Sequence, residues 1–185
     1  MANLVIARKG YGQVEPNHLS ARYNGQVYAQ LPAMQAGAHT TPIAQLENGQ
    51  FLKYNYAGNA ATTDGDGEWM LVYCEEKLYD ERYQNHKDFV LLASDNTDKT
   101  IYPRLLKTTV GDIYTTNTFG GNATGRDATI GTSIILSVGN KLKVGTTGFL
   151  ELVGQNESPT GPIFQVVKEY TLPDKQNAVK IQRIA

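Results

Sequence analysis

Two Asn-Gly pairs, each set between strand-like runs, constrain the fold of this chain more than any other feature. The first is Asn24-Gly25, within Ser20–Leu31, and the second is Asn48-Gly49, within Pro42–Tyr56. A two-residue hairpin turn of type I′ needs a positive φ at both central residues, and Asn followed by Gly adopts that conformation at the least steric cost. The sequence therefore predicts two antiparallel hairpins within residues 20–57.

The rest of the chain shows the same succession of short apolar runs and turn residues, with further turns predicted at Gly111-Asp112 and Gly139-Asn140. Regular short strands separated by turn signals are typical of a β-barrel or sandwich. One charged stretch, residues 76–88, has Leu78, Arg82 and Tyr83 at roughly helical spacing and predicts one short helix. The predicted strands are Trp69–Glu75, Phe89–Ala93, Ile113–Phe119, Ile134–Val138, Lys141–Val144, Phe149–Val153, Ile163–Leu172 and Ala178–Ile184.

These patterns predict an all-β protein: an antiparallel β-barrel or sandwich built from hairpins, with an extended N-terminal arm and long polar loops. Residues 1–19 are the predicted arm, and an edge strand that packs on its own domain is the alternative. Residues 20–185 form the β-rich body, either as one unit or as two small β subdomains at 20–119 and 132–185. A glycine-rich loop over residues 120–131 would join the two parts.

Charge and hydrophobicity narrow the classes of partner. The net charge is −1, and the 17 Lys and Arg residues are spread along the chain, so no direct nucleic-acid binding is expected. The apolar runs fall far short of the roughly 20 residues that span a bilayer, so no membrane contact is expected. The N-terminus lacks the apolar core of a secretory signal, which indicates a product made in the cytoplasm.

No motif in the chain predicts catalysis or metal binding. The single cysteine, Cys74, ends an apolar run and is predicted to be buried rather than reactive. Asp64, Asp66 and Glu68 resemble the start of a calcium loop, but the residues that follow are a predicted strand, and a solvated acidic turn is the better interpretation. We therefore expect no catalytic residue, no metal site and no cofactor, and we expect the protein not to be an enzyme.

Three stretches together resemble small virion structural proteins of tailed bacteriophages, of the capsid decoration or cement class. Asn140 stands where that class usually has Asp, which changes a turn residue but not the turn. The stretches are Ile43–Lys53, Tyr102–Phe119 and Leu136–Glu151.

The resemblance implies a β-rich protein without an active site, which binds and stabilises the assembled phage capsid. Its partners would be the major capsid protein and copies of itself, as a homo-oligomer such as a trimer. Its place would be the capsid exterior of the virion, after synthesis in the host cytoplasm. Two alternatives stay open: a ligand- or carbohydrate-binding β-module of a phage fibre, and a component of the tail or neck.

The N-terminal arm is the predicted contact with the partner subunit. It holds three consecutive apolar residues, and burying each large side chain contributes about 1.5–3 kcal/mol before ordering costs. If the arm is not the anchor, the loop around Gln35–Thr41 is the next candidate. The predicted interface residues are Leu4, Val5, Ile6, Arg8, Lys9 and Tyr11.

Overall fold

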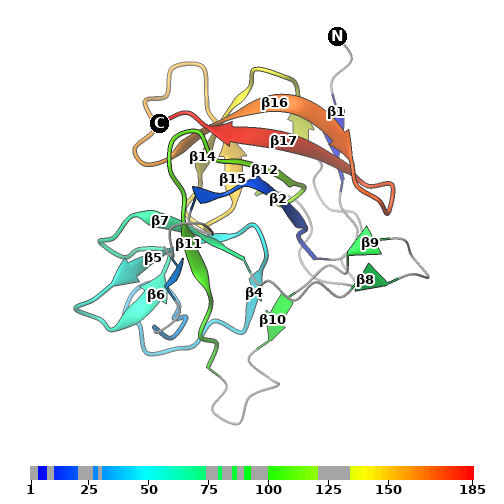
Figure 1. The fold of residues 1–185 in the computed structure, drawn as a ribbon. Helices are drawn as coiled ribbons and strands as arrows, with labels where there is room; N and C mark the ends of the chain where they lie inside the picture. Colours follow the sequence, from blue (N-terminus) through cyan, green and yellow to red (C-terminus); the bar gives the residue numbers. More distant parts are fainter. Residues whose placement is uncertain are drawn as a thin grey trace.

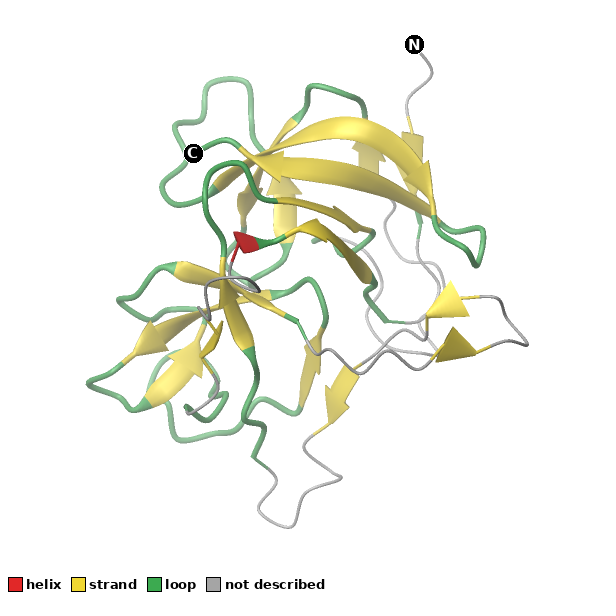
Figure 2. Ribbon diagram, viewed as in Figure 1, coloured by secondary structure: helices red, strands yellow, loops and turns green. Residues whose placement is uncertain are grey.

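The computed structural model describes residues 4–7, 11–20, 27–28, 31–73, 79–80, 85–86, 90–92, 100–120 and 134–185. Within these ranges the protein is all-β, as predicted, and Ser20 alone has helical backbone (Figure 2). The described strands form a six-stranded sheet, a five-stranded sheet and three two-stranded sheets, all antiparallel. None of the sheets closes into a barrel, so the architecture is sandwich-like.

The six-stranded sheet lies at the top of the view in Figure 1 and presents one face to the core. Along its longest strand, Phe164 and Val166 are buried, whereas Gln165 is half-buried and Val167 is exposed. This is the period of two that a sheet with one covered face requires. The order is β15 (Leu150–Leu152), β14 (Lys141–Val144), β16 (Ile163–Thr171), β17 (Asn177–Arg183), β12 (Ile113–Thr116) and β2 (Val14–His18).

The five-stranded sheet is covered on both faces. All four residues of its central strand are buried, and so are all three residues of its edge strand Ala60–Thr62. A strand that packs on two cores reads as a continuous apolar run rather than an alternating one, which explains Trp69–Val72. The order is β3 (Val27–Tyr28), β11 (Leu105–Lys107), β7 (Trp69–Val72), β5 (Phe51–Asn55) and β6 (Ala60–Thr62).

Three two-stranded sheets complete the described fold, and one of them replaces the predicted helix. β8 (Tyr79–Asp80) pairs with β9 (Asn85–His86), so the helix predicted over residues 76–88 is wrong. That prediction rested on the spacing of three side chains, and local spacing cannot exclude a short hairpin. The other two pairs are β1 (Leu4–Ile6) with β13 (Ile134–Leu136), and β4 (Gln45–Glu47) with β10 (Val90–Leu92).

Two apolar clusters hold the sheets together. The larger cluster lies between the six-stranded and five-stranded sheets and includes Phe51, Leu71, Tyr114 and Phe164. The rings of Phe51 and Phe164, one from each sheet, have centroids 5.6 Å apart. The smaller cluster lies on the other face of the five-stranded sheet and is formed by Ala33, Leu46, Leu52, Tyr54, Ala61, Met70, Val72, Ile101 and Leu105.

The Asn48-Gly49 pair forms a turn but not the predicted hairpin. Gly49 has φ 89°, but Asn48 is not among the residues with positive φ, so the turn is not of type I′. The strands on its two sides belong to different sheets, because β4 pairs with β10 and β5 pairs with β6 and β7. The turn therefore carries the chain from one sheet to another. The Asn24-Gly25 hairpin lies outside the described residues.

The same kind of turn occurs at Gly49, Gly111 and Gly139, with positive φ at each glycine. In each turn the residue after glycine donates its N–H to the carbonyl three residues earlier, and its side chain accepts the N–H of that earlier residue. This confirms the turns predicted at Gly111-Asp112 and Gly139-Asn140. The side-chain oxygen of Gln50 accepts the N–H of Glu47 (3.3 Å), that of Asp112 accepts the N–H of Thr109 (2.9 Å), and that of Asn140 accepts the N–H of Ser137 (2.8 Å).

The described part of residues 1–19 belongs to the sheets of the body. β2 pairs with β12 in the six-stranded sheet, and the N–H of Gly12 donates to the buried Glu47 carboxylate (2.9 Å). β1 pairs with β13, and Ile6 is fully buried, as the alternative of an edge strand on its own domain requires. The sheets also do not divide the chain between residues 119 and 132, because β12 pairs with β17.

Candidate functional site

The predicted interface residues divide between the core and the surface. Leu4 is half-buried and packs on the larger core, Ile6 is fully buried, and Val5 between them is 42% exposed. Tyr11 is half-buried, while Arg8 and Lys9 lie outside the described residues. The period of two in β1 therefore leaves one residue of the apolar triple, Val5, facing solvent.

Val5 is part of a larger group of exposed apolar side chains. It lies directly opposite Ile135 of β13, which is 53% exposed. The turn after β13 exposes Val138, and the irregularity in β16 exposes Val167. The N–H of Gly139 donates to the carbonyl of Val166 (2.8 Å), which places the turn against β16. We refer to Val5, Ile135, Val138 and Val167 as the apolar patch.

The sequence contained a signal for this patch that the prediction did not use. Ile134-Ile135-Leu136 is a run of three apolar residues in a predicted strand, and Leu4-Val5-Ile6 is a second such run, in the predicted arm. When two such runs pair antiparallel as a two-stranded sheet with one covered face, the middle residue of each faces solvent. The pairing of segments about 130 residues apart was not visible in the sequence.

Asp64, from the predicted acidic turn, holds two loops together. Its carboxylate accepts hydrogen bonds from the N–H of Gly37 (2.8 Å), from Thr62 Oγ1 (2.7 Å) and from the His39 ring at Nε2 (2.8 Å). The hydrogen bond from His39, followed by that from Gly37, holds the pKa of Asp64 well below its usual range. Asn55 Nδ2 lies 3.4 Å from the other ring nitrogen of His39.

This arrangement does not activate a nucleophile. Both ring nitrogens of His39 are engaged, and the Thr62 hydroxyl donates to Asp64 rather than to the imidazole. Glu68, the third acid of that stretch, pairs with Lys107 at 2.6 Å. Within the described ranges, no three His, Cys, Asp or Glu side chains are grouped so that they could hold a metal ion. Cys74 lies outside those ranges, and its burial stays a prediction.

A second carboxylate, Asp112, is fully buried and shapes the start of β12. It accepts hydrogen bonds from the N–H of Ser20 (3.0 Å), from Ser20 Oγ (2.5 Å) and from the N–H of Thr109 (2.9 Å). These donors tie the segment after β2 to the turn before β12. Both carboxylates therefore hold backbone in place.

A cleft of about 240 Å³ opens between the two larger sheets. Trp69 forms one wall and is largely buried, as predicted, and Lys53 Nζ lies 4.7 Å from the centre of the indole ring. Gly161, with φ 98°, packs against this ring, and a Cβ there would lie 3.2 Å from Trp69 Cδ1. The lining residues are Lys53, Gly67, Glu68, Trp69, Thr160, Gly161, Pro162 and Arg183.

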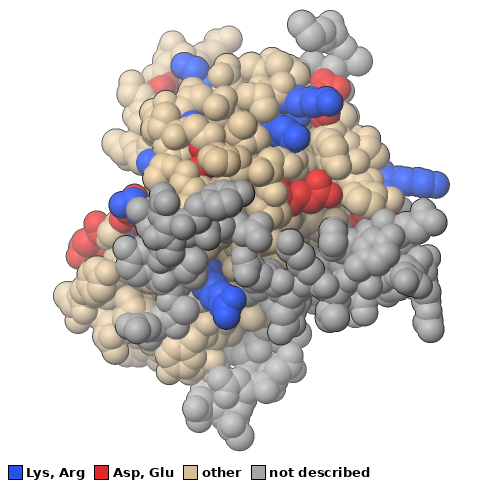
Figure 3. Space-filling view, in the orientation of Figure 1, with Lys and Arg blue, Asp and Glu red and all other residues tan. Residues whose placement is uncertain are grey.

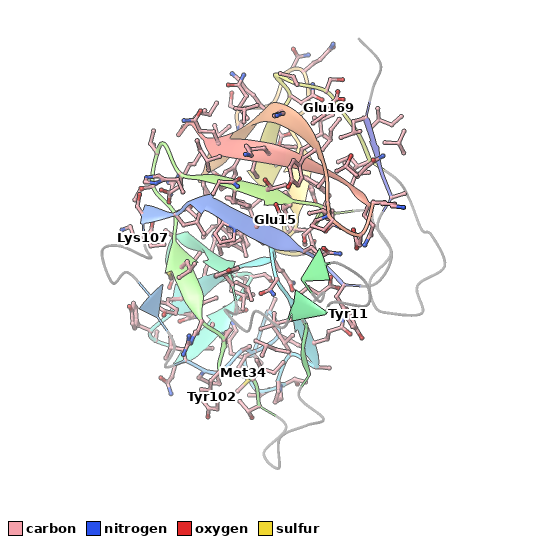
Figure 4. All side chains as sticks on the ribbon, turned by 45° about the vertical axis from the view of Figure 1, so that its right-hand side comes forward. Tyr11, Glu15, Met34, Tyr102, Lys107 and Glu169 are labelled. Carbon is pink, nitrogen blue, oxygen red and sulfur yellow. The ribbon has the colours of Figure 1, made fainter. Side chains whose placement is uncertain are left out.

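Two basic side chains, Lys53 and Arg183, line the cleft. Arg183 donates through Nε to an oxygen of Ala185, the last residue of the sequence (3.0 Å), and through Nη1 to the carbonyl and hydroxyl of Thr108. The one acid of the lining, Glu68, is paired with Lys107, which is labelled in Figure 4. In the part of the chain that the structure describes, Lys53 has no carboxylate within ion-pair distance.

The surface of the six-stranded sheet has no field of a single sign on the side that Figure 3 shows. Basic and acidic side chains are scattered there among uncharged ones. Among the described residues, no helix has the length and apolar character needed to cross a membrane.

No protein-family model matches the chain, and no curated protein or solved structure matches it either. The fold and the contacts described above are therefore the observations on which a function can be argued.

Proposed function

We propose that this chain is a non-enzymatic structural protein of a phage virion, which attaches to an assembled capsid in the manner of a decoration protein. The observation that carries the proposal is the apolar patch. Single exposed apolar residues are ordinary on a protein surface, but several on adjoining segments indicate a contact surface for another protein. Val5, predicted from sequence as part of the partner interface, lies within the patch.

A small apolar patch can bind a repeating capsid shell tightly even if each single contact is weak. Burying apolar surface contributes about 25 cal/mol per Å², so a few valine and isoleucine side chains supply only modest affinity at one contact. A protein that presents several copies of the patch to a repeating shell binds through several contacts at once, and its avidity exceeds the affinity of each. A homo-oligomer, such as a trimer, on the capsid exterior would have this property.

The use of the buried and clustered carboxylates also supports a non-catalytic role. Asp64 and Asp112 each accept hydrogen bonds from backbone N–H groups and from hydroxyls of neighbouring segments. A general base or nucleophile needs a free lone pair directed at a substrate, and a general acid needs a proton directed at it. In both clusters the hydrogen bonds join loops to strands instead.

The test is co-sedimentation with shells assembled from the major capsid protein of the same genome. The double variant Val5→Thr, Ile135→Thr should keep the fold, because threonine is suited to strands, and should bind the shells at least tenfold more weakly. Val110→Thr is the matched control, since Val110 is 66% exposed on a different turn. Light scattering of the free protein measures its oligomeric state. Full occupancy by the double variant would contradict the proposal.

A second candidate, a carbohydrate-binding module, has one observation in its favour. Tyr56 is 73% exposed, and Tyr102 is also exposed at the end of the five-stranded sheet where Figure 4 labels it near Met34. Exposed tyrosine rings offer flat apolar faces with a polar end, which suits the stacking of a sugar. Binding to a glycan array that disappears in both Tyr56→Ala and Tyr102→Ala would favour this candidate over the first.

A further inference from the structure

We propose that Asn48-Gly49 is a latent site of spontaneous deamidation, which the fold protects and which reacts in chains that remain unfolded. Asn-Gly pairs are typical of exposed turns, but here residues 46–50 are all buried, and Asn48 is only 8% exposed. The pair shares no residue with the apolar patch, so this proposal goes beyond capsid attachment and does not depend on it.

The chemistry begins at the peptide nitrogen that follows asparagine. The nitrogen of Gly49 gives its proton to a solvent base and attacks Cγ of Asn48, and the side-chain amide leaves as ammonia, with a proton taken back from solvent, as a cyclic imide closes. Water then opens the ring. Opening at Cγ gives aspartate, whereas opening at the backbone carbonyl gives isoaspartate, in which the main chain passes through the side chain. Because glycine has no Cβ to obstruct the attack, an unfolded Asn-Gly pair is especially reactive.

The first protection is the hydrogen bonding of the Gly49 nitrogen. Its N–H donates to the carbonyl of Val72 (3.0 Å), and Val72 donates its own N–H to the carbonyl of Gln50 (2.7 Å). These two bonds fasten the buried turn to the end of β7 and engage the proton that the reaction has to remove. Deamidation therefore requires local opening of the turn, and its rate falls with the fraction of molecules that are open.

The second protection is Thr118, which is fully buried and packs on the turn. Its hydroxyl donates to the backbone carbonyl of Asn48 (2.9 Å), and a Cβ at Gly49 would lie 2.7 Å from its side chain. Ring closure needs the backbone of the turn to rotate until Cγ of Asn48 reaches the Gly49 nitrogen. The bonded carbonyl and the close packing oppose that rotation.

Either product fits the buried turn poorly. Aspartate would add a second carboxylate to a turn that already buries Glu47, which is 2% exposed, and a buried charge without a partner is costly. Isoaspartate lengthens the main chain between Glu47 and Gln50, whose hydrogen bond from N–H to carbonyl closes the turn. We therefore expect a chain that deamidates at Asn48 while unfolded to lose its ability to fold.

Peptide mapping by mass spectrometry tests the protection. The protein is held in mildly alkaline buffer with or without concentrated urea, and fragmentation of the tryptic peptide 23–53 distinguishes Asn48 from Asn24. Asn48 should deamidate about tenfold or more slowly in the folded protein than in urea, because the reaction has to wait for opening. In urea, Asn24-Gly25 gives the reactivity of the same pair in the same unfolded chain. Equal rates at Asn48 with and without urea would overturn the proposal.

Variants of Thr118 test the contact that holds the turn. Thr118→Val removes the hydroxyl and keeps the volume, so it should speed deamidation of Asn48 in the folded protein, whereas Thr118→Ser should leave it slow. An unchanged rate in Thr118→Val would contradict the protection assigned to this hydroxyl. If Thr118→Val does not fold, the comparison of the parent protein with and without urea still decides whether the fold protects Asn48.

The consequence for folding is tested by refolding after timed incubation in urea. Chains modified at Asn48 should be depleted from the folded fraction, which size-exclusion chromatography separates. The variant Asn48→Asp, which carries one of the two products, should have a lower urea midpoint, and Asn156→Asp, at an exposed position, should keep that of the parent protein. Equal proportions of chains modified at Asn48 in the folded and unfolded fractions would show that the modification does not impair folding and would overturn this part of the proposal.

Discussion

The six-stranded and five-stranded sheets bury their side chains in different ways, and the difference explains how well the sequence could be interpreted. The six-stranded sheet has one face on the core, and buried and more exposed positions alternate along β14 and along the first half of β16. The five-stranded sheet is packed on both faces, and β7 is buried throughout. Alternation marks a strand clearly, whereas a continuous apolar run shows burial but not which neighbours provide it.

The second face of the five-stranded sheet is covered by irregular chain rather than by another large sheet. Ala33 pairs with Ala61 and donates its N–H to the carbonyl of Ile101 (2.7 Å), and Leu46 packs in the smaller core. The buried backbone N–H and C=O groups of such a segment form individual hydrogen bonds, because they are not part of a regular ladder between strands. A segment whose apolar residues show no regular period can therefore still be well buried.

The largest expected effect comes from the core that the two sheets share. Phe164→Ala should lower the free energy of unfolding by about 4 kcal/mol, because it removes a fully buried ring that contacts Phe51 and Tyr114. Urea unfolding followed by circular dichroism measures the loss. Val167→Ala, on the exposed face of the same strand, should change stability by less than about 0.5 kcal/mol. Similar losses in the two variants would contradict the one-face description of this sheet.

Leu46→Ala tests whether the smaller core belongs to the same cooperative unit. Leu46 is fully buried, and its truncation should lower the free energy of unfolding by about 3 kcal/mol in a single transition. Urea titrations monitored by Trp69 fluorescence and by far-ultraviolet circular dichroism should then coincide. If global stability is unchanged while limited proteolysis within residues 31–44 becomes faster, the cover unfolds separately from the sheets.

A pair of glycine substitutions compares the turns of the two regions. Gly49→Ala should cost about 2 kcal/mol and Gly139→Ala about 1 kcal/mol, because both need a positive φ but only Gly49 lacks space for a Cβ. A Cβ at Gly49 would lie 2.7 Å from Thr118, whereas nothing lies within 4 Å of one at Gly139. Thermal unfolding of both variants measures the difference. Equal costs would show that the contact with Thr118 relaxes freely.

The smallest effect concerns the acid dependence of stability at the edge of the five-stranded sheet. Hydrogen bonds lower the pKa of Asp64 below its usual 3.8, so the stability gained from its ionised form is present above that pH and is lost as the pH falls below it. Asp64→Asn should lower the urea midpoint slightly at neutral pH and flatten its decline in acid. Asp66→Asn, an exposed neighbour, is the control. A decline in Asp64→Asn as steep as in the parent protein would contradict this role.

The sequence predicted most of the strands of the last third because their signals are local. β14 matches Lys141–Val144, and β16 and β17 match their predicted ranges within one residue at each end. The turn residues at Gly111 and Gly139 act through backbone conformation, which neighbouring residues decide. For the same reason Asn48-Gly49 was correctly predicted as a turn, while the pairing of the strands on its two sides was not.

By itself, the sequence determined an all-β class, the positions of many strands and the polar character of the turns. Only the tertiary structure decided which strands pair: β4 with β10, β1 with β13, and β2 with β12. The tertiary structure also decided which residues form the apolar patch and the cleft, because both join residues that are far apart in the chain. Val5 lies opposite Ile135, and Lys53, Trp69 and Arg183 line one cleft. Local chemistry sets φ, ψ and the alternation of side chains, but long-range partners are chosen by how all the apolar faces can be buried at once.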